Sequence, residues 1–203
     1  VDYHIWRRLA WPILVATILV LLIPILPGTH AIAPTVNGAR RWVDLGFINF
    51  QPSEIARLAI IIWCAMLATK KGEQVREFKK GLAPFLFVIG LVSLLILLQP
   101  NMSMAVLVAL LGGIVLFAAG AKIGHFLLLG IVTVIAGLQL IQRAGYRAER
   151  LDKFLNGAEG TSQIYQSLVG IGAGRLFGVG FGEGQQKFGY VSYAYSDFIF
   201  STV

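Results

Sequence analysis

The feature that most constrains this chain is a long charge-free run, because no Asp, Glu, Lys or Arg occurs between Lys80 and Lys122. The run is too long for one helix across a hydrocarbon core of about 30 Å, which takes about 20 residues. Gln-Pro-Asn at 99–101 interrupts it near the middle, and such a sequence favours a turn. We therefore expect two membrane-spanning helices, 81–98 and 102–121, joined by a hairpin.

Three further runs have a similar character. Residues 10–27 and 123–142 carry no charge, and 55–69 carries only Arg57, near one end, where its long side chain could reach the interface. With 57% hydrophobic and 13% charged residues, the composition also argues against a soluble protein. The sequence predicts an all-α polytopic membrane protein, a helix bundle with about five transmembrane helices within 1–142.

The basic residues lie mainly in the gaps between these runs. One side of the membrane would hold eight Lys or Arg, namely Arg7, Arg8, Lys122 and those of 70–80, whereas the short loops opposite hold Arg40 and Arg41. The positive-inside rule then places 70–80 in the cytoplasm. Four basic residues within 143–153 fall on the outer side and count against this orientation. The net charge of +7 thus reflects placement in a bilayer, and we expect no nucleic-acid partner.

Residues 143–203 are the unusual part, because they are too long for a simple connector. We expect a large extracellular loop with short helices, including an interfacial helix at 146–155 and helical turns at 162–170. Seven glycines follow between 170 and 184, and they fit neither GxxxxGK[ST] nor GxGxxG. They favour either tight turns in a re-entrant loop or backbone contacts to a non-nucleotide diphosphate.

A polar cluster precedes the second span. Arg40 and Arg41 could clamp a diphosphate through bidentate hydrogen bonds, or contact lipid headgroups instead. Ser53 and Glu54 suit the start of a helix, as N-cap residue and first-turn acid. At the other hairpin we expect Asn101 to satisfy backbone groups, a structural role.

Several chemistries are not indicated. A serine hydrolase lacks both a GxSxG motif and a histidine in the tail that could act as its base. The three histidines are far apart and Cys64 is the single cysteine, so no metal site and no intramolecular disulfide is expected.

Five stretches occur together in an order typical of one family. They are GARRWVDLG (38–46), FQPSEIARLA (50–59), QP (99–100), YQSLVGIGAGRLFGVGFGEGQQK (165–187) and SDFIF (196–200). Each is weak alone, but the set resembles the SEDS proteins, the FtsW/RodA family of shape, elongation, division and sporulation proteins. The QQK run is more similar to the FtsW-like division branch than to the RodA-like elongation branch.

The resemblance implies a multi-pass protein of the bacterial inner membrane. It would polymerise lipid II into glycan strands by inverting transfer, with undecaprenyl diphosphate as the leaving group, beside a class B penicillin-binding protein. The resemblance implies no definite cofactor, and a divalent cation stays open. Such proteins resemble ten-helix bundles, so this chain would supply spans three to seven of a longer protein. A lipid-linked precursor flippase and a non-catalytic division scaffold stay open as alternatives.

The family's loop aspartate corresponds to Asp197, which the resemblance makes the general base. From local sequence alone, Asp197 could instead cap the next helix. The substrate-binding residues implied are Arg40, Arg41, Gln166, Arg175 and Lys187. The chain departs from the family pattern at four positions: Tyr193 and Tyr195 replace a Glu and a His, Asn101 replaces an acidic residue, and Ser103 replaces a glycine.

Overall fold

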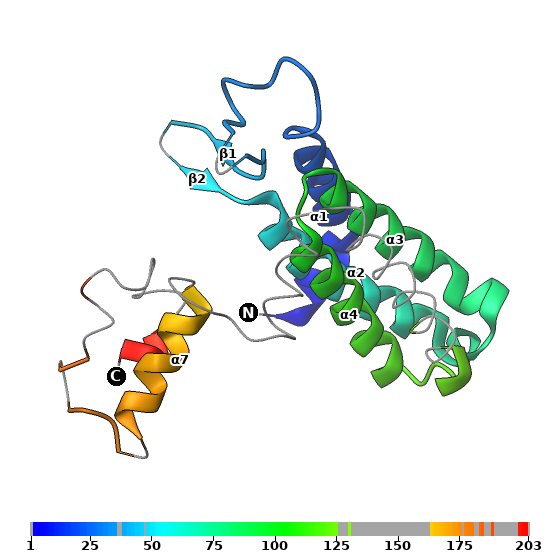
Figure 1. Cartoon of the computed structure of the whole chain (residues 1–203). Coiled ribbons are helices and arrows are strands. Elements are labelled where there is room, and N and C mark those ends of the chain that lie inside the picture. The colour runs from blue at the N-terminus through cyan, green and yellow to red at the C-terminus, as the bar shows by residue number, and fades with distance from the viewer. Residues whose placement is uncertain are drawn as a thin grey trace. The chain divides into compact units, whose positions relative to one another are not determined.

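The computed structural model describes residues 2–35, 38–46, 48–125, 130, 163–175, 177–180, 183–184, 188 and 199–202. They belong to two compact units, Val1–Gly130 and Ile131–Val203. The helices described in the first unit are α1 (Tyr3–Leu22), α2 (Pro52–Lys71), α3 (Ala83–Leu98) and α4 (Met102–Ala118) (Figure 1). A 3-10 helix, η1 (Gly72–Arg76), and a π-helical turn, η2 (Phe78–Leu82), connect α2 to α3.

The first helix does not coincide with its charge-free run, because α1 begins and ends before the corresponding ends of the predicted span 10–27. Asp2 caps α1 by accepting a hydrogen bond from the His4 backbone N–H at 3.0 Å, which together with the His4 ring lowers the pKa of Asp2. The helix ends at Leu22, and Pro24 lies in the turn that follows. Pro24 lacks an N–H and cannot donate the hydrogen bond that would continue the helix, and the apolar residues 23–27 form turns instead.

Three described segments are long and apolar enough to cross a membrane: Tyr3–Leu22, Pro52–Arg76 and Phe78–Leu98. The fourth, Met102–Ala118, is apolar but shorter. The predicted spans 81–98 and 102–121 thus correspond to α3 and α4, and 55–69 lies within α2. Most of the predicted span 123–142, and all of 146–155, lies outside the described residues.

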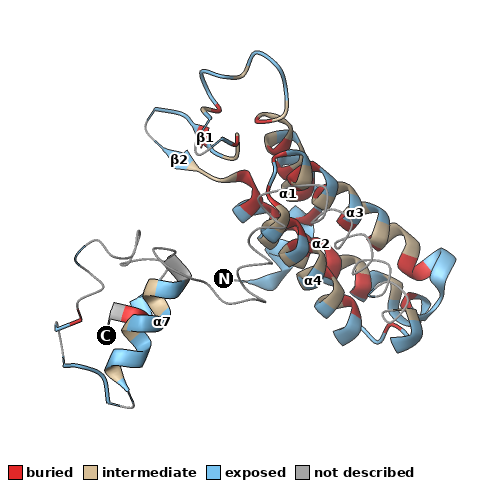
Figure 2. Ribbon diagram, in the orientation of Figure 1, coloured by how far each residue is buried: buried red, intermediate tan, exposed pale blue. Residues whose placement is uncertain are grey.

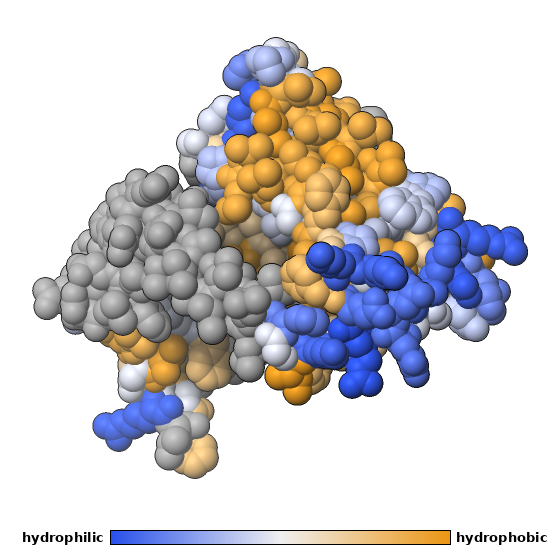
Figure 3. Space-filling view, turned by 90° about the vertical axis from the view of Figure 1, so that its right-hand side faces the viewer, coloured by the Kyte–Doolittle hydropathy of each residue, from blue (hydrophilic) through white to orange (hydrophobic). Residues whose placement is uncertain are grey.

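The bundle packs through α2, which contacts α1 and α4, while α3 also packs against α4 (Figure 1). Trp63 of α2 lies at its centre, with ring centroids 5.5 Å from Trp11 and 5.7 Å from Phe85. Buried residues face inward along the helices, and exposed faces lie outside (Figure 2). The face of the bundle seen in Figure 3 carries a broad apolar area, with hydrophilic residues gathered beside it. This distribution suits a bundle surrounded by lipid.

Small residues allow α4 to approach its neighbours closely. A Cβ atom at Gly112 would lie 2.5 Å from Cδ1 of Ile89 and 3.4 Å from Cγ2 of Ile60. Small residues at helix contacts are typical of membrane bundles, where packing rather than the hydrophobic effect drives association.

A two-stranded antiparallel hairpin precedes α2 and was not predicted. Its strands are β1 (Val43–Asp44) and β2 (Asn49–Phe50), with Val43 opposite Phe50. The Asp44 carboxylate accepts a hydrogen bond from the Gly46 N–H at 2.8 Å, and Gly46 has φ +83°, which suits glycine. Apart from this hairpin, the predicted all-α membrane bundle is confirmed.

The second unit contains α7 (Gln163–Gly174) and η4 (Ile199–Thr202), which pack against each other (Figure 1). The helical turns predicted at 162–170 therefore belong to α7. Beyond this helix the backbone N–H of Gly178 donates to the Gly174 carbonyl at 2.7 Å, and Gly178 and Gly180 have φ +74° and +116°. The glycines described here thus make turns of the kind that glycine permits.

Candidate functional site

Arg40 lies in the connection between α1 and β1, where it binds the preceding loop. Its Nε donates to the Ala33 carbonyl at 3.0 Å and its Nη1 to the Leu26 carbonyl at 3.4 Å. Its Nη2 donates to Oγ1 of Thr29 at 2.5 Å, and that hydroxyl donates to the Ile23 carbonyl at 2.6 Å. The half-buried guanidinium therefore organises the loop that leaves α1.

Arg41 reaches a different part of the chain, the turn between α3 and α4. Its Nε donates to the Gln99 carbonyl at 3.3 Å and its Nη2 to the Pro100 carbonyl at 2.6 Å. Carbonyls use its donors without neutralising its charge, so Arg41 keeps a positive charge at this end of the bundle. Its Nη1 has no hydrogen-bond partner among the described residues.

Gln99 and Asn101 complete this junction. The Gln99 side chain is 1% exposed, and its Nε2 donates to the Leu21 carbonyl at 2.8 Å, whereas its Oε1 has no partner among the described residues. Asn101 occupies the N-cap position of α4, where its Oδ1 accepts a hydrogen bond from the Met104 N–H at 3.4 Å. The sequence pointed to Asn101 but gave Gln99 no role beyond breaking the apolar run.

The start of α2 differs from the prediction for Ser53. The helix begins at Pro52, so Gln51 takes the N-cap position and Ser53 lies inside the first turn. Proline is favoured at the first helical position because its φ angle already suits the helix, and this moves the start two residues earlier than the predicted cap at Ser53. Ser53 is buried, and its hydroxyl has no partner among the described residues. Glu54 lies in the first turn and pairs with Arg57.

The predicted site residues of the second unit are only partly described. Gln166 lies on α7, which packs against η4, and Arg175 follows the end of α7. Arg175 is exposed, and its φ of +51° is unusual for a residue other than glycine. Asp197 and Lys187 lie outside the described residues, so their roles stay predictions. In the described part of the chain, no three His, Cys, Asp or Glu side chains come close enough to bind a metal ion.

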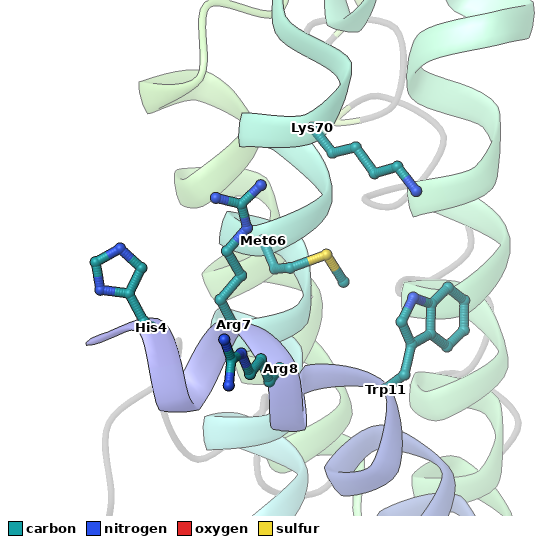
Figure 4. Close-up of a pocket in the computed structure, with 6 residues that line it drawn as sticks. All are labelled: His4, Arg7, Arg8, Trp11, Met66 and Lys70. Atoms are coloured by element: carbon teal, nitrogen blue, oxygen red, sulfur yellow. The ribbon is translucent and has the colours of Figure 1, made fainter. Parts of the chain in front are cut away.

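A basic pocket of about 500 Å³ lies between the start of α1 and the end of α2, and the sequence did not predict it. Figure 4 shows its lining, which consists of His4, Arg7, Arg8, Trp11, Met66 and Lys70. Their spacing in the sequence could have located it. The α1 residues are three or four positions apart and the two α2 residues are four apart, so each set lies on one face of its helix.

Comparison with known proteins decides the family. The profile of the cell cycle proteins FtsW, RodA and SpoVE matches residues 1–203, the whole of this sequence. The chain belongs to the FtsW/RodA/SpoVE family. This confirms the resemblance seen in the five motifs, and it agrees with the apolar helices in identifying a membrane protein.

Two curated relatives and one solved structure illustrate the similarity. The chain is 35% identical to a probable peptidoglycan glycosyltransferase FtsW of Geobacter sp. (strain M18), over 100% of this chain and 56% of the relative. It is 34% identical to stage V sporulation protein E of Bacillus subtilis, over 99% of this chain and 55% of that protein. The chain thus spans about half the length of these relatives.

The solved structure comes from work on the structural coordination of polymerization and crosslinking by a peptidoglycan synthase complex. The match covers 84% of this chain and 50% of the chain in that structure, with a TM-score of 0.65 and 25% sequence identity. The helix arrangement of this family is therefore present here.

Proposed function

We propose that the intact protein polymerises lipid II into glycan strands during cell division, at the outer face of the inner membrane. The observation that carries this proposal is the family match over residues 1–203, together with relatives named as probable peptidoglycan glycosyltransferases. The described helices are compatible with it, because α3 and α4 contain no Asp, Glu, Lys or Arg and those of α1 and α2 lie near the helix ends. A flippase would more naturally place such groups within its spans.

In the proposed reaction Asp197 is the general base. The acceptor hydroxyl attacks the anomeric carbon of the lipid-linked donor and loses its proton to the carboxylate, while undecaprenyl diphosphate leaves. The leaving group is already a diphosphate, so a second protein acid is less necessary. Arg41, Arg175 and Lys187 would neutralise its charge, and Gln166 and Arg40 would complete the substrate site.

Two features of the second unit support this assignment. The short helix η4 begins two residues after Asp197 and packs against α7, the helix that carries Gln166. Arg175 holds a left-handed backbone conformation, which costs a residue other than glycine about 1–3 kcal/mol and often marks a functional position. A glycine at position 175 would adopt this conformation without that cost. We therefore infer that the arginine stands there for its charge.

The proposed setting is the inner membrane of a bacterium, with 70–80 in the cytoplasm and the second unit outside. A class B penicillin-binding protein would cross-link the strands that this protein polymerises. Support comes from the similarity to a chain of a synthase complex that couples polymerization and crosslinking.

The test is glycan polymerisation from purified lipid II by the intact protein and its Asp197→Asn variant. Asparagine caps a helix about as well as aspartate but cannot accept the proton, so activity should fall roughly 10²-fold or more with expression and melting temperature unchanged. Glu183→Gln is the matched control, since it neutralises an exposed carboxylate of the same unit. Near-normal activity of the Asp197 variant would contradict the general-base role, and an inactive intact protein would favour a scaffold.

A further inference from the structure

The basic pocket between α1 and α2 has no role in the proposed polymerisation. His4, Arg7, Arg8 and Trp11 share one face of α1, and Met66 and Lys70 share one face of α2. Figure 4 shows the two sets around a common opening, with charged groups from both helices and the apolar side chains of Trp11 and Met66. The pocket therefore combines cationic and apolar surface.

The three permanent cations of this pocket are uncompensated. Arg7, Arg8 and Lys70 are exposed and make no hydrogen bond or ion pair with any described residue. No carboxylate lines the pocket, and the nearby Asp2 is bound to the His4 ring at 2.7 Å. Three like charges close together repel one another, which favours an anion between them.

The helix geometry places the pocket at the edge of the apolar layer. Trp11 lies four residues beyond Arg7, about 6 Å farther along the axis at 1.5 Å per residue. Arginines at a helix end with a tryptophan one turn deeper match the headgroup region and the interface below it. A ligand here would present its anion to the cations and its apolar part to Trp11 and Met66.

We propose that Arg7, Arg8 and Lys70 bind the phosphate of an anionic phospholipid, whose acyl chains lie along Trp11 and Met66. Guanidinium groups bind phosphate oxygens bidentately, and an ammonium group adds a point charge. The neighbouring segment 70–80 is also rich in Lys and Arg, so the whole end of the bundle attracts an anionic leaflet. The pocket makes this attraction local by fixing one headgroup between two helices.

Native mass spectrometry of the intact protein in nanodiscs would test this, with phosphatidylglycerol and phosphatidylcholine as the two probe lipids. We expect phosphatidylglycerol to remain bound in preference to phosphatidylcholine. In the variant Arg7→Gln/Arg8→Gln/Lys70→Gln the preference for phosphatidylglycerol should fall at least about tenfold. Each basic residue near an anionic surface raises the affinity for that surface about fivefold. Arg7→Lys/Arg8→Lys, which keeps the charges, should retain most of it.

The matched control is Arg76→Gln/Lys79→Gln/Lys80→Gln, which removes the same charge from exposed residues outside the pocket. It should lose a smaller part of the preference than the pocket variant, because these residues do not line the pocket and contribute only to the diffuse attraction of this end of the bundle. An equal loss in both variants would overturn the proposal in favour of diffuse attraction. Equal retention of both lipids, or displacement of bound phosphatidylglycerol by millimolar inorganic phosphate, would also overturn it.

Discussion

Two pairs of adjacent arginines lie beside tryptophans at opposite ends of the same bundle, and they are used differently. Arg7 and Arg8, next to Trp6, make no hydrogen bond or ion pair with a described residue. Arg40 and Arg41, next to Trp42, donate to carbonyls of the connection after α1 and of the α3–α4 turn. In the sequence, both pairs would suit binding a phosphate.

The difference follows from the backbone around each pair. The carbonyls of a helix are already hydrogen-bonded within it, so arginines on α1 find no backbone acceptor nearby. Irregular loops leave carbonyls such as those of Leu26, Ala33 and Pro100 without strand or helix partners, and an arginine in such a loop satisfies them. The loop pair thus supports the fold through its carbonyl contacts, with the Arg41 charge still present for a ligand, whereas the helix pair has no described partner at all.

The largest expected effect concerns which side of the membrane each end faces. In a Cys64→Ala background, we expect an impermeant maleimide to label Leu45→Cys on the hairpin in intact spheroplasts. Gln74→Cys of η1 should react only after permeabilisation, because the basic residues of 70–80 favour the cytoplasm. Both positions are exposed, so burial does not limit either reaction. The reverse pattern would invert the orientation of both arginine pairs.

Arg40→Ala should cause the largest loss of stability among the four arginines. It leaves the carbonyls of Ala33 and Leu26 and the Thr29 hydroxyl without a charged donor, which we expect to cost about 2–3 kcal/mol. The measurement is unfolding of the intact protein by SDS titration in mixed micelles. A change below about 0.5 kcal/mol, the usual range for a surface substitution, would show that Arg40 does not organise the loop.

Arg41→Ala should destabilise the protein less, by about 1–2 kcal/mol, because it removes two donors to the α3–α4 turn. Arg41→Lys keeps the positive charge but loses the hydrogen-bond geometry, because one ammonium group cannot replace the planar guanidinium at both carbonyls. We expect this variant to be destabilised as well, yet to polymerise lipid II better than the alanine variant. Equal activity of the two variants would argue that the charge of Arg41 does not serve the substrate.

How much of this was predictable depends on the type of signal. Charge-free runs predicted the α3 and α4 helices and the turn between them, because burial in lipid excludes charge over a fixed length. The same signal misplaced α1, since the helix stops before Pro24 although no charge is near, and Arg7 and Arg8 lie inside it. Apolar composition marks what can lie in lipid, but backbone chemistry decides where the helix ends.

The junction of Arg41 with Gln99 could not be predicted, because 58 residues separate them and no local pattern specifies such a pairing. The family resemblance indicated that Arg41 matters, without showing that part of its role is to bind carbonyls. Ser53 shows a related limit: serine suits an N-cap, but the adjacent Pro52 suits the first helical position and sets the start.

At the other end, Arg7→Gln/Arg8→Gln should leave the stability in mixed micelles within about 0.5 kcal/mol of the original, since neither side chain has a described partner to lose. Relief of repulsion with Lys70 could even raise it slightly. The measurement is the same SDS titration, in a micelle free of anionic phospholipid. A loss as large as that of Arg40→Ala would mean that both pairs are structural.

The smallest effect is expected at Asn101, beside the Arg41 junction. Asn101 caps α4, and aspartate is an equally good N-cap residue that also favours the positive end of the helix. Asn101→Asp should therefore leave stability almost unchanged and lipid II polymerisation within about threefold. The family resemblance implied an acidic residue at this position, so Asn101→Asp also tests whether a carboxylate beside Arg41 contributes to the reaction. A gain of tenfold or more, on the order of 1.4 kcal/mol of barrier, would show that this end takes part in the chemistry. Asn101 would then belong, with Arg41, to the substrate site rather than to the cap of α4 alone.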